Sequence, residues 1–203
     1  MTEAPLREEE IEAAKRNIKF IRATTTYSIR HGGSHSLNIR GDSKAFVRIG
    51  EDWETEVVIA TAYIHNFLYG YLSDSALSLI ADGESSELMN LAIAINNMRD
   101  IDSQFYDEDI DNQTRGFLIE TFEVEKPFRN LGIGRTAARK MLISAGAPGH
   151  PVFAEPGVIG DDGPGIEIID RFWTKLEPGM RAYDNKKDSL RLIYSPELPT
   201  NLD

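Results

Sequence analysis

Apolar residues recur at helical intervals near the start of the chain, between Leu6 and Ala23. Glu8 to Glu10 stand early in this stretch, where the positive end of a helix dipole attracts negative charge, so an N-terminal helix is predicted. The β-branched residues that follow predict strands, with Gly41 and Asp42 as a turn between the first two. The predicted strands cover residues 37–40, 45–49 and 56–64.

The pattern changes in the middle of the chain. Apolar residues three and four positions apart predict helices between Ser73 and Arg99, and the aspartate-rich residues 100–114 predict a solvated loop. From Gly116 the pattern runs strand, helix, strand, helix, strand, and it ends in a polar tail. This alternation is typical of an α/β domain. The predicted elements cover residues 116–124, 131–145, 151–155, 166–176 and 189–194.

Composition and charge exclude several classes of protein. The 203 residues are 41% hydrophobic, which fits a single domain spanning 1–203. The absence of cysteine excludes disulfides, thiolate metal sites and cysteine nucleophiles. A net charge of −11 disfavours nucleic-acid binding, and no apolar run is long enough for a transmembrane helix. Because the acidic N-terminus lacks the features of a secretory signal, we expect a cytoplasmic protein with no membrane partner.

The most informative segment joins the strand that begins at residue 116 to the next helix. The first amides of a helix have no intrahelical acceptor and can bind a diphosphate, and Gly132 and Gly134 leave room for one to approach. Arg129 and Arg135 concentrate positive charge there. The pattern GxGxxG fails because Ala137 replaces the third glycine, and the pattern GxxxxGK[ST] is absent. The alternative interpretation is a plain surface turn without a ligand.

The letters RNLGIG at residues 129–134 resemble the acetyl-coenzyme A signature RxxGxG of the GNAT superfamily of acyltransferases. The resemblance spans Gly116 to Tyr194 and implies a central mixed β-sheet flanked by helices, here with an extra N-terminal helix. It makes residues 116–195 the acyl-coenzyme A-binding half. Residues 1–115 depart from the usual order of elements in the family and form the expected acceptor side. The implied reaction transfers an acyl group from acetyl-coenzyme A, or another acyl-coenzyme A, directly to an amine.

The resemblance also implies which residues hold the cofactor. In the family, the backbone at the position of Val124 pairs with the pantetheine arm, and the amides of the glycine turn hold the diphosphate. Because these contacts use the backbone, the residue type can vary at every position of the turn except the two glycines. The predicted cofactor site consists of Phe122, Val124, Arg129, Asn130, Leu131, Gly132, Ile133, Gly134 and Arg135.

Transfer to an amine needs a base and benefits from an acid. Alternation along the strand places Glu120 on the same face as Val124, so Glu120 is the first candidate base; a structural pairing with an arginine is the alternative. Glu155 is the second candidate base; the alternative is that Glu155 is a loop residue that faces solvent. Many family members carry an acidic tyrosine where Trp173 stands here, and indole cannot serve. Tyr183 is the candidate that would act as the acid in place of that tyrosine; the alternative is a structural role.

No metal site is expected. His31 and His35 have a suitable spacing, but the glycines between them indicate a loop, and the aspartates from Asp107 to Asp111 fail the calcium-loop pattern. The expected partner is a small-molecule or peptide amine, attracted if cationic, and a homodimer is compatible with the sequence. Because Leu118 and Trp173 occupy positions where the family often carries catalytic groups, the alternatives are a noncatalytic coenzyme A-binding module and a plain protein-interaction module.

Overall fold

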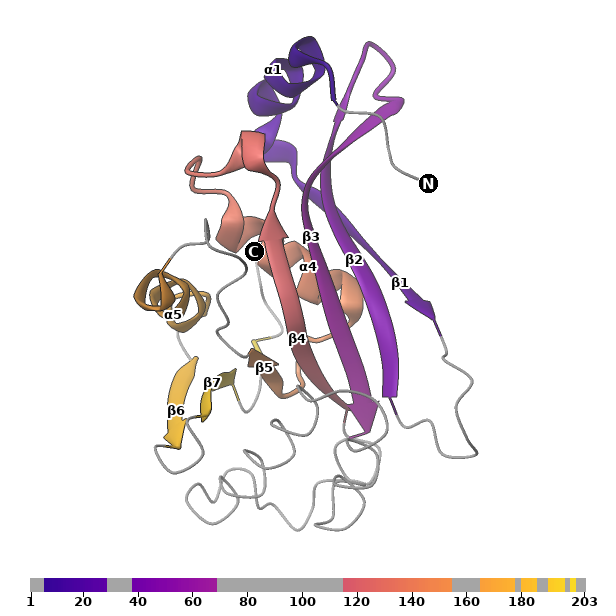
Figure 1. The fold of residues 1–203 in the computed structure, drawn as a ribbon. Helices are drawn as coiled ribbons and strands as arrows, with labels where there is room; N and C mark the ends of the chain where they lie inside the picture. Colours follow the sequence, from indigo (N-terminus) through magenta and orange to yellow (C-terminus); the bar gives the residue numbers. More distant parts are fainter. Residues whose placement is uncertain are drawn as a thin grey trace.

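The computed structural model describes residues 6–28, 38–68, 115–154, 165–177, 180–185, 190–195 and 198–199 (Figure 1). The helices within these ranges are α1 (Glu8–Arg16), η1 (Ile18–Phe20), η4 (Lys126–Phe128), α4 (Gly134–Ala145) and α5 (Ile166–Thr174). The strands are β1 (Arg22–Ser28), β2 (Asn38–Ile49), β3 (Thr55–Leu68), β4 (Arg115–Val124), β5 (Val152–Ala154), β6 (Arg181–Asn185) and β7 (Leu190–Ser195).

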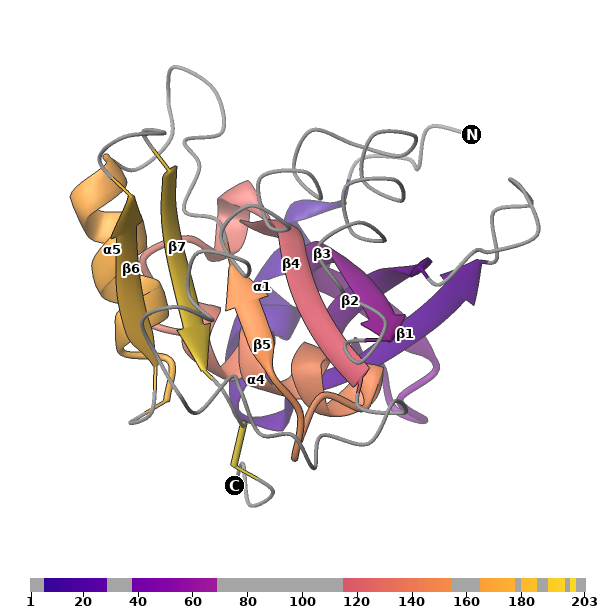
Figure 2. The same ribbon diagram turned by 90° about the horizontal axis from the view of Figure 1, so that it is seen from below.

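The seven strands form one mixed sheet in the order β1-β2-β3-β4-β5-β7-β6 (Figure 2). The pair β4 and β5 is parallel, and the other neighbouring strands are antiparallel. Because parallel strands need a crossover connection, helix α4 lies between β4 and β5 in the sequence. The predicted α/β class with a mixed sheet is confirmed. None of the described helices is long and apolar enough to cross a membrane.

The main hydrophobic core lies between the helices and one face of the sheet. Helix α4 contributes Ala137 and Met141, α1 contributes Ala14, and α5 contributes Trp173 to a cluster that includes Ile64 of β3. Figure 1 shows α4 behind the long strands. Four large apolar side chains of the described residues are buried outside this cluster, and the strand registers place three of them, on β4, β5 and β7, side by side on the opposite face. They are Phe46, Leu118, Phe153 and Tyr194.

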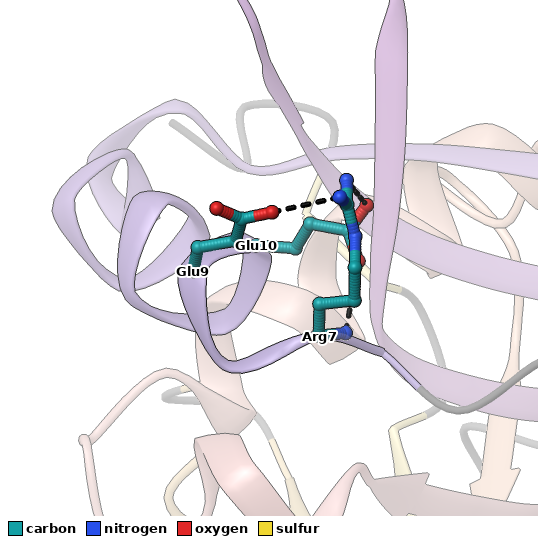
Figure 3. Close-up of polar contacts among 3 residues, drawn as sticks. All are labelled: Arg7, Glu9 and Glu10. Atoms are coloured by element: carbon teal, nitrogen blue, oxygen red, sulfur yellow. Dashed lines mark hydrogen bonds and ion pairs between the residues drawn. The ribbon is translucent and has the colours of Figure 1, made fainter.

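The N-terminal helix is shorter than the periodicity predicts. It ends at Arg16, and the residues from Arg22 to Ser28, partly included in the predicted helix, form edge strand β1 instead. Figure 3 shows how the helix begins: the backbone N–H and the guanidinium of Arg7 both donate to the Glu10 carboxylate, each at 2.9 Å, and Arg7 also pairs with Glu9. These hydrogen bonds from Arg7 hold the pKa of the Glu10 carboxyl below its ordinary value.

The predicted turn at Gly41 and Asp42 is wrong, because β2 runs through both residues as one strand. Gly41 lies opposite Tyr27 of β1, and a Cβ on Gly41 would lie 2.8 Å from Cε1 of the Tyr27 ring. The glycine is therefore needed for a close approach within the sheet rather than for a chain reversal. The predicted helices at 73–99 and the acidic stretch at 100–114 lie outside the described residues.

Candidate functional site

The glycine turn lies between β4 and α4, as the sequence pattern predicts. The buried ring of Phe128 anchors the loop after β4, and the chain then reverses through Asn130 and Gly132, whose φ angles are +62° and +72°. A Cβ on Gly132 would meet no atom within 4 Å. Gly132 therefore serves the left-handed backbone and leaves open space beside it. The Leu131 side chain is exposed, whereas Ile133 is buried.

Gly134 has a different role, because the space beside it is filled. A Cβ there would lie 3.0 Å from Cε2 of Phe172, which comes from α5. The Phe172 ring stacks on Phe122 of β4 with centroids 5.4 Å apart and meets the Trp173 ring edge-on at 4.8 Å. This aromatic cluster joins β4, α5 and the start of α4. Trp173 is buried in this cluster and packs against both phenylalanine rings.

Arg129 ties the turn to the end of β4. Its Nε donates to the carbonyl of Val124 at 2.9 Å, and its Nη2 pairs with the Glu123 carboxylate at 2.7 Å. The guanidinium therefore orients the loop, and its charge is partly balanced by Glu123. Arg135, in the first turn of α4, reaches the Lys175 carbonyl at 3.5 Å and remains exposed.

The start of α4 presents backbone amides without a side-chain cap. Its N-cap residue is Ile133, and its first turn contains no acidic residue. The amides of residues 134–136 precede the first intrahelical bond, which runs from Ala137 N–H to the Ile133 carbonyl. Such a terminus stabilises a bound anion through its N–H groups and the helix dipole.

The end of β4 has an edge that no described strand covers. Pairing with β5 stops at Ile119, which lies opposite Ala154. The Glu125 N–H donates to Ile59 of β3, so the carbonyl of Val124 in the same peptide points away from β3, toward the β5 side. Because the backbone of a strand repeats every two residues, the carbonyl of Phe122 points to the same side as that of Val124. The Val124 carbonyl already accepts from Nε of Arg129, so an extended ligand that ran along β4 here, beside the start of α4, would share it.

A β-bulge alters the predicted position of Glu120. Tyr63 of β3 pairs with Thr121 and Ile64 pairs with Ile119, so Glu120 is an extra residue without a partner on β3. The bulge reverses the alternation of side chains along β4. Glu120 therefore lies on the face opposite Val124, and the prediction that they share a face is wrong.

The partner of Glu120 is a histidine that sequence reasoning missed. Oε2 of Glu120 lies 2.7 Å from Nε2 of His65 on β3, so the alternative pairing with an arginine is also wrong. The His65 side chain is 6% exposed and that of Glu120 is 19% exposed. The one sequence signal for His65 is its place at the end of a run of buried strand residues.

The other predicted residues are only partly described. Glu155, His31, His35 and the aspartates of the loop at 107–111 lie outside the described residues. Tyr183 belongs to β6 and pairs through its backbone with Leu192 of β7. Among the described residues, no group of three histidine or carboxylate side chains is placed to hold a metal ion.

A comparison of the sequence with models of known protein families finds no match, and a comparison with curated proteins finds none either. Three features of the described residues bear on function: the glycine turn, the edge of β4 that no described strand covers, and the pair of Glu120 and His65.

Proposed function

We propose that this chain is a GNAT-like N-acyltransferase that uses acetyl-coenzyme A or another acyl-coenzyme A. The observation that carries the proposal is the open edge of β4 beside the uncapped start of α4, joined by a turn with Gly132 in the left-handed conformation. The strand order, with its parallel pair β4 and β5 and with α4 between them in the sequence, is compatible with that fold.

The amides at the start of α4 and around Gly132 would hold the diphosphate, and the pantetheine arm would follow β4 past Val124 and Phe122. Val124 and Thr121 are three registers apart, and Glu120 is the extra residue within the next register, so at about 3.3 Å per residue Glu120 lies about 10 to 13 Å along β4 from Val124. Glu120 is also the next residue after the last pair of β4 with β5, where the two strands part. In this proposal the thioester, at the end of the arm, lies at the level of Glu120.

In the proposed reaction, Glu120 accepts a proton from the acceptor ammonium. The neutral amine attacks the thioester carbonyl carbon, the new C–N bond forms, and the C–S bond breaks to release coenzyme A as a thiolate that is then protonated. Backbone amides near the thioester would stabilise the developing oxyanion. No covalent enzyme intermediate is needed. Glu155 remains the second candidate base, and Tyr183 remains the candidate acid.

The first test is the melting temperature with and without acetyl-coenzyme A, in the parent protein and in two variants. Gly132→Glu places a carboxylate at the diphosphate site. Gly146→Glu is the matched control, because Gly146 also has a positive φ and open space, but lies at the opposite end of α4. At ligand near 100 times its Kd, the parent and Gly146→Glu should gain about 2.7 kcal/mol, roughly 5 to 10 °C.

The gain should be absent in Gly132→Glu. A well-folded parent that shows no shift at millimolar acetyl-coenzyme A would overturn the proposal. An equal shift in both glutamate variants would place the ligand elsewhere.

A noncatalytic coenzyme A-binding module is the second candidate. It is favoured by the packing of Trp173 against Phe122 and Phe172, which leaves this position without a group that can protonate a thiolate. Both candidates predict the thermal shift. They differ in the release of free thiol during a screen of amine acceptors, which only the enzyme produces.

A further inference from the structure

The carboxylate of Glu120 is backed by a histidine on the neighbouring strand. The two residues are 55 positions apart in the sequence, and Nε2 of His65 lies 2.7 Å from Oε2 of Glu120. His65 is the more deeply buried member, and Glu120 is the more exposed one. In the described part of the chain, Oε1 of Glu120 has no hydrogen-bond partner. The arrangement leaves one carboxylate oxygen held and the other available.

The bulge in β4 is what brings the pair together. Glu120 is the unpaired residue of β4, and it shares a sheet face with Leu118, which lies opposite His65. Bulges re-aim side chains next to functional sites. Without the extra residue, alternation would direct Glu120 and Phe122 to one face, among the aromatic rings that join α5 to β4.

Charged and titratable groups surround the pair on this face. On β2, Arg40 lies opposite His65, and its guanidinium stacks on the Tyr63 ring at 3.8 Å from the ring centroid. Asp42, also on β2, lies opposite Tyr63. Farther along β4, Glu123 is paired with Arg129. Toward β5 and β7, the residues in register on this face are Leu118, Phe153 and Tyr194. Among the described residues, Arg40 is thus the cation that lies directly opposite His65 on β2.

We propose that His65 is a positioning residue for Glu120: it holds Oε2 so that Oε1 faces the acceptor amine. The role rests on the proposed acyltransferase function. In the reaction, an N–H bond of the ammonium breaks, an O–H bond forms at Oε1, and the hydrogen bond from Nε2 of His65 to Oε2 is kept throughout. A carboxylate with two free oxygens would instead sample orientations that miss the amine.

The first measurement needs no activity. Nitrogen-15 NMR of the histidine rings, with His65→Gln to assign the signal, should show a proton on Nε2 of His65 that exchanges slowly with solvent. Glu120→Ala should speed that exchange, and Thr61→Val, on the same face of β3, should leave it unchanged. A His65 ring protonated only on Nδ1, or an exchange rate unaffected by Glu120→Ala, would overturn the dyad, whatever the protein's function.

The second measurement uses the acyl-transfer assay. His65→Leu removes the donor and should lower kcat about 10- to 100-fold with the KM for acyl-coenzyme A unchanged. His65→Gln keeps an N–H donor and should retain kcat within about fivefold. Equal losses in the two variants, with melting temperatures near the parent's, would refute positioning.

Failure of the acyltransferase function can be distinguished from failure of the positioning role of His65. If acetyl-coenzyme A does not stabilise the parent, the acyltransferase function fails, and the NMR measurement alone decides whether the pair exists. If acetyl-coenzyme A stabilises the parent and free thiol is released, but His65→Leu leaves kcat unchanged, only the positioning role of His65 is rejected.

Discussion

Replacement of Gly41 by alanine tests how β1 is held against β2. A Cβ at this position would lie 2.8 and 3.0 Å from Cε1 and Cδ1 of Tyr27, and 2.9 Å from Cγ2 of Thr25. Neither neighbour can move freely. The Tyr27 hydroxyl donates to the Ala145 carbonyl at the end of α4, and the Thr25 hydroxyl is hydrogen-bonded to Ser43 at 2.7 Å.

Two opposing effects set the magnitude. Glycine inside a strand costs about 0.5–1 kcal/mol relative to alanine, so alanine would stabilise an uncrowded position. Overpacking typically costs about 1–3 kcal/mol, and contacts below 3.0 Å between anchored groups belong to the upper part of that range. We therefore expect Gly41→Ala to lower the free energy of unfolding by about 1–2 kcal/mol, or roughly 2 to 8 °C in melting temperature.

The assay is urea unfolding in two backgrounds. Thr25→Ser removes the crowding methyl but keeps the hydroxyl that bonds to Ser43, and Tyr27→Ala removes the ring. In this double variant, Gly41→Ala should change sign and stabilise the protein by about 0.5–1 kcal/mol. If Gly41→Ala destabilises both backgrounds equally, crowding by Thr25 and Tyr27 is not the cause.

Two further predictions concern the partly desolvated hydroxyl of Tyr27 and the buried carboxylate of Glu177. Burial raises the pKa of Tyr27, against the opposing effects of Asn66 and Arg115; the unfolded chain therefore loses this proton first, and stability falls as the pH rises above about 10. Tyr27→Phe should flatten that fall in urea titrations between about pH 10 and 12, and parallel curves would contradict this. Arg139 donates to the Leu176 carbonyl and lies beside the buried Glu177 carboxylate, so Arg139→Met should cost about 3 kcal/mol. Adding Glu177→Met should recover most of this loss in chemical denaturation, and failure to recover would show that the lost contact is the one with the carbonyl.

Local periodicity located the elements of the second half of the chain closely. The strand predicted at 116–124 is β4, and the helix predicted at 131–145 is α4, which begins at Gly134 because Asn130 to Ile133 form the turn. Helix α4 has a one-sided apolar pattern and ends at Gly146, and β4 is a short run of apolar residues that ends before Pro127, so local sequence signals decide their extent.

Elements that depend on pairing were harder to predict. Strand β6, Arg181–Asn185, is polar and was not predicted; it is a strand because β7 supplies its hydrogen bonds at the sheet edge. Likewise, Gly41 and Asp42 carry a local turn signal that the pairing of β2 with β1 and β3 overrides. A local turn propensity is overridden when two neighbouring strands supply hydrogen bonds to the backbone of every residue in the strand between them.

The sequence by itself determined the α/β class, the order of elements around the glycine turn, and the choice of Glu120 as a carboxylate of interest. Only the tertiary structure decided which face Glu120 occupies and that His65 is its partner. The physical reason is that strand register arises from long-range pairing. One extra residue in β4 reverses its alternation, and a contact across 55 residues leaves no trace in local hydrophobic periodicity.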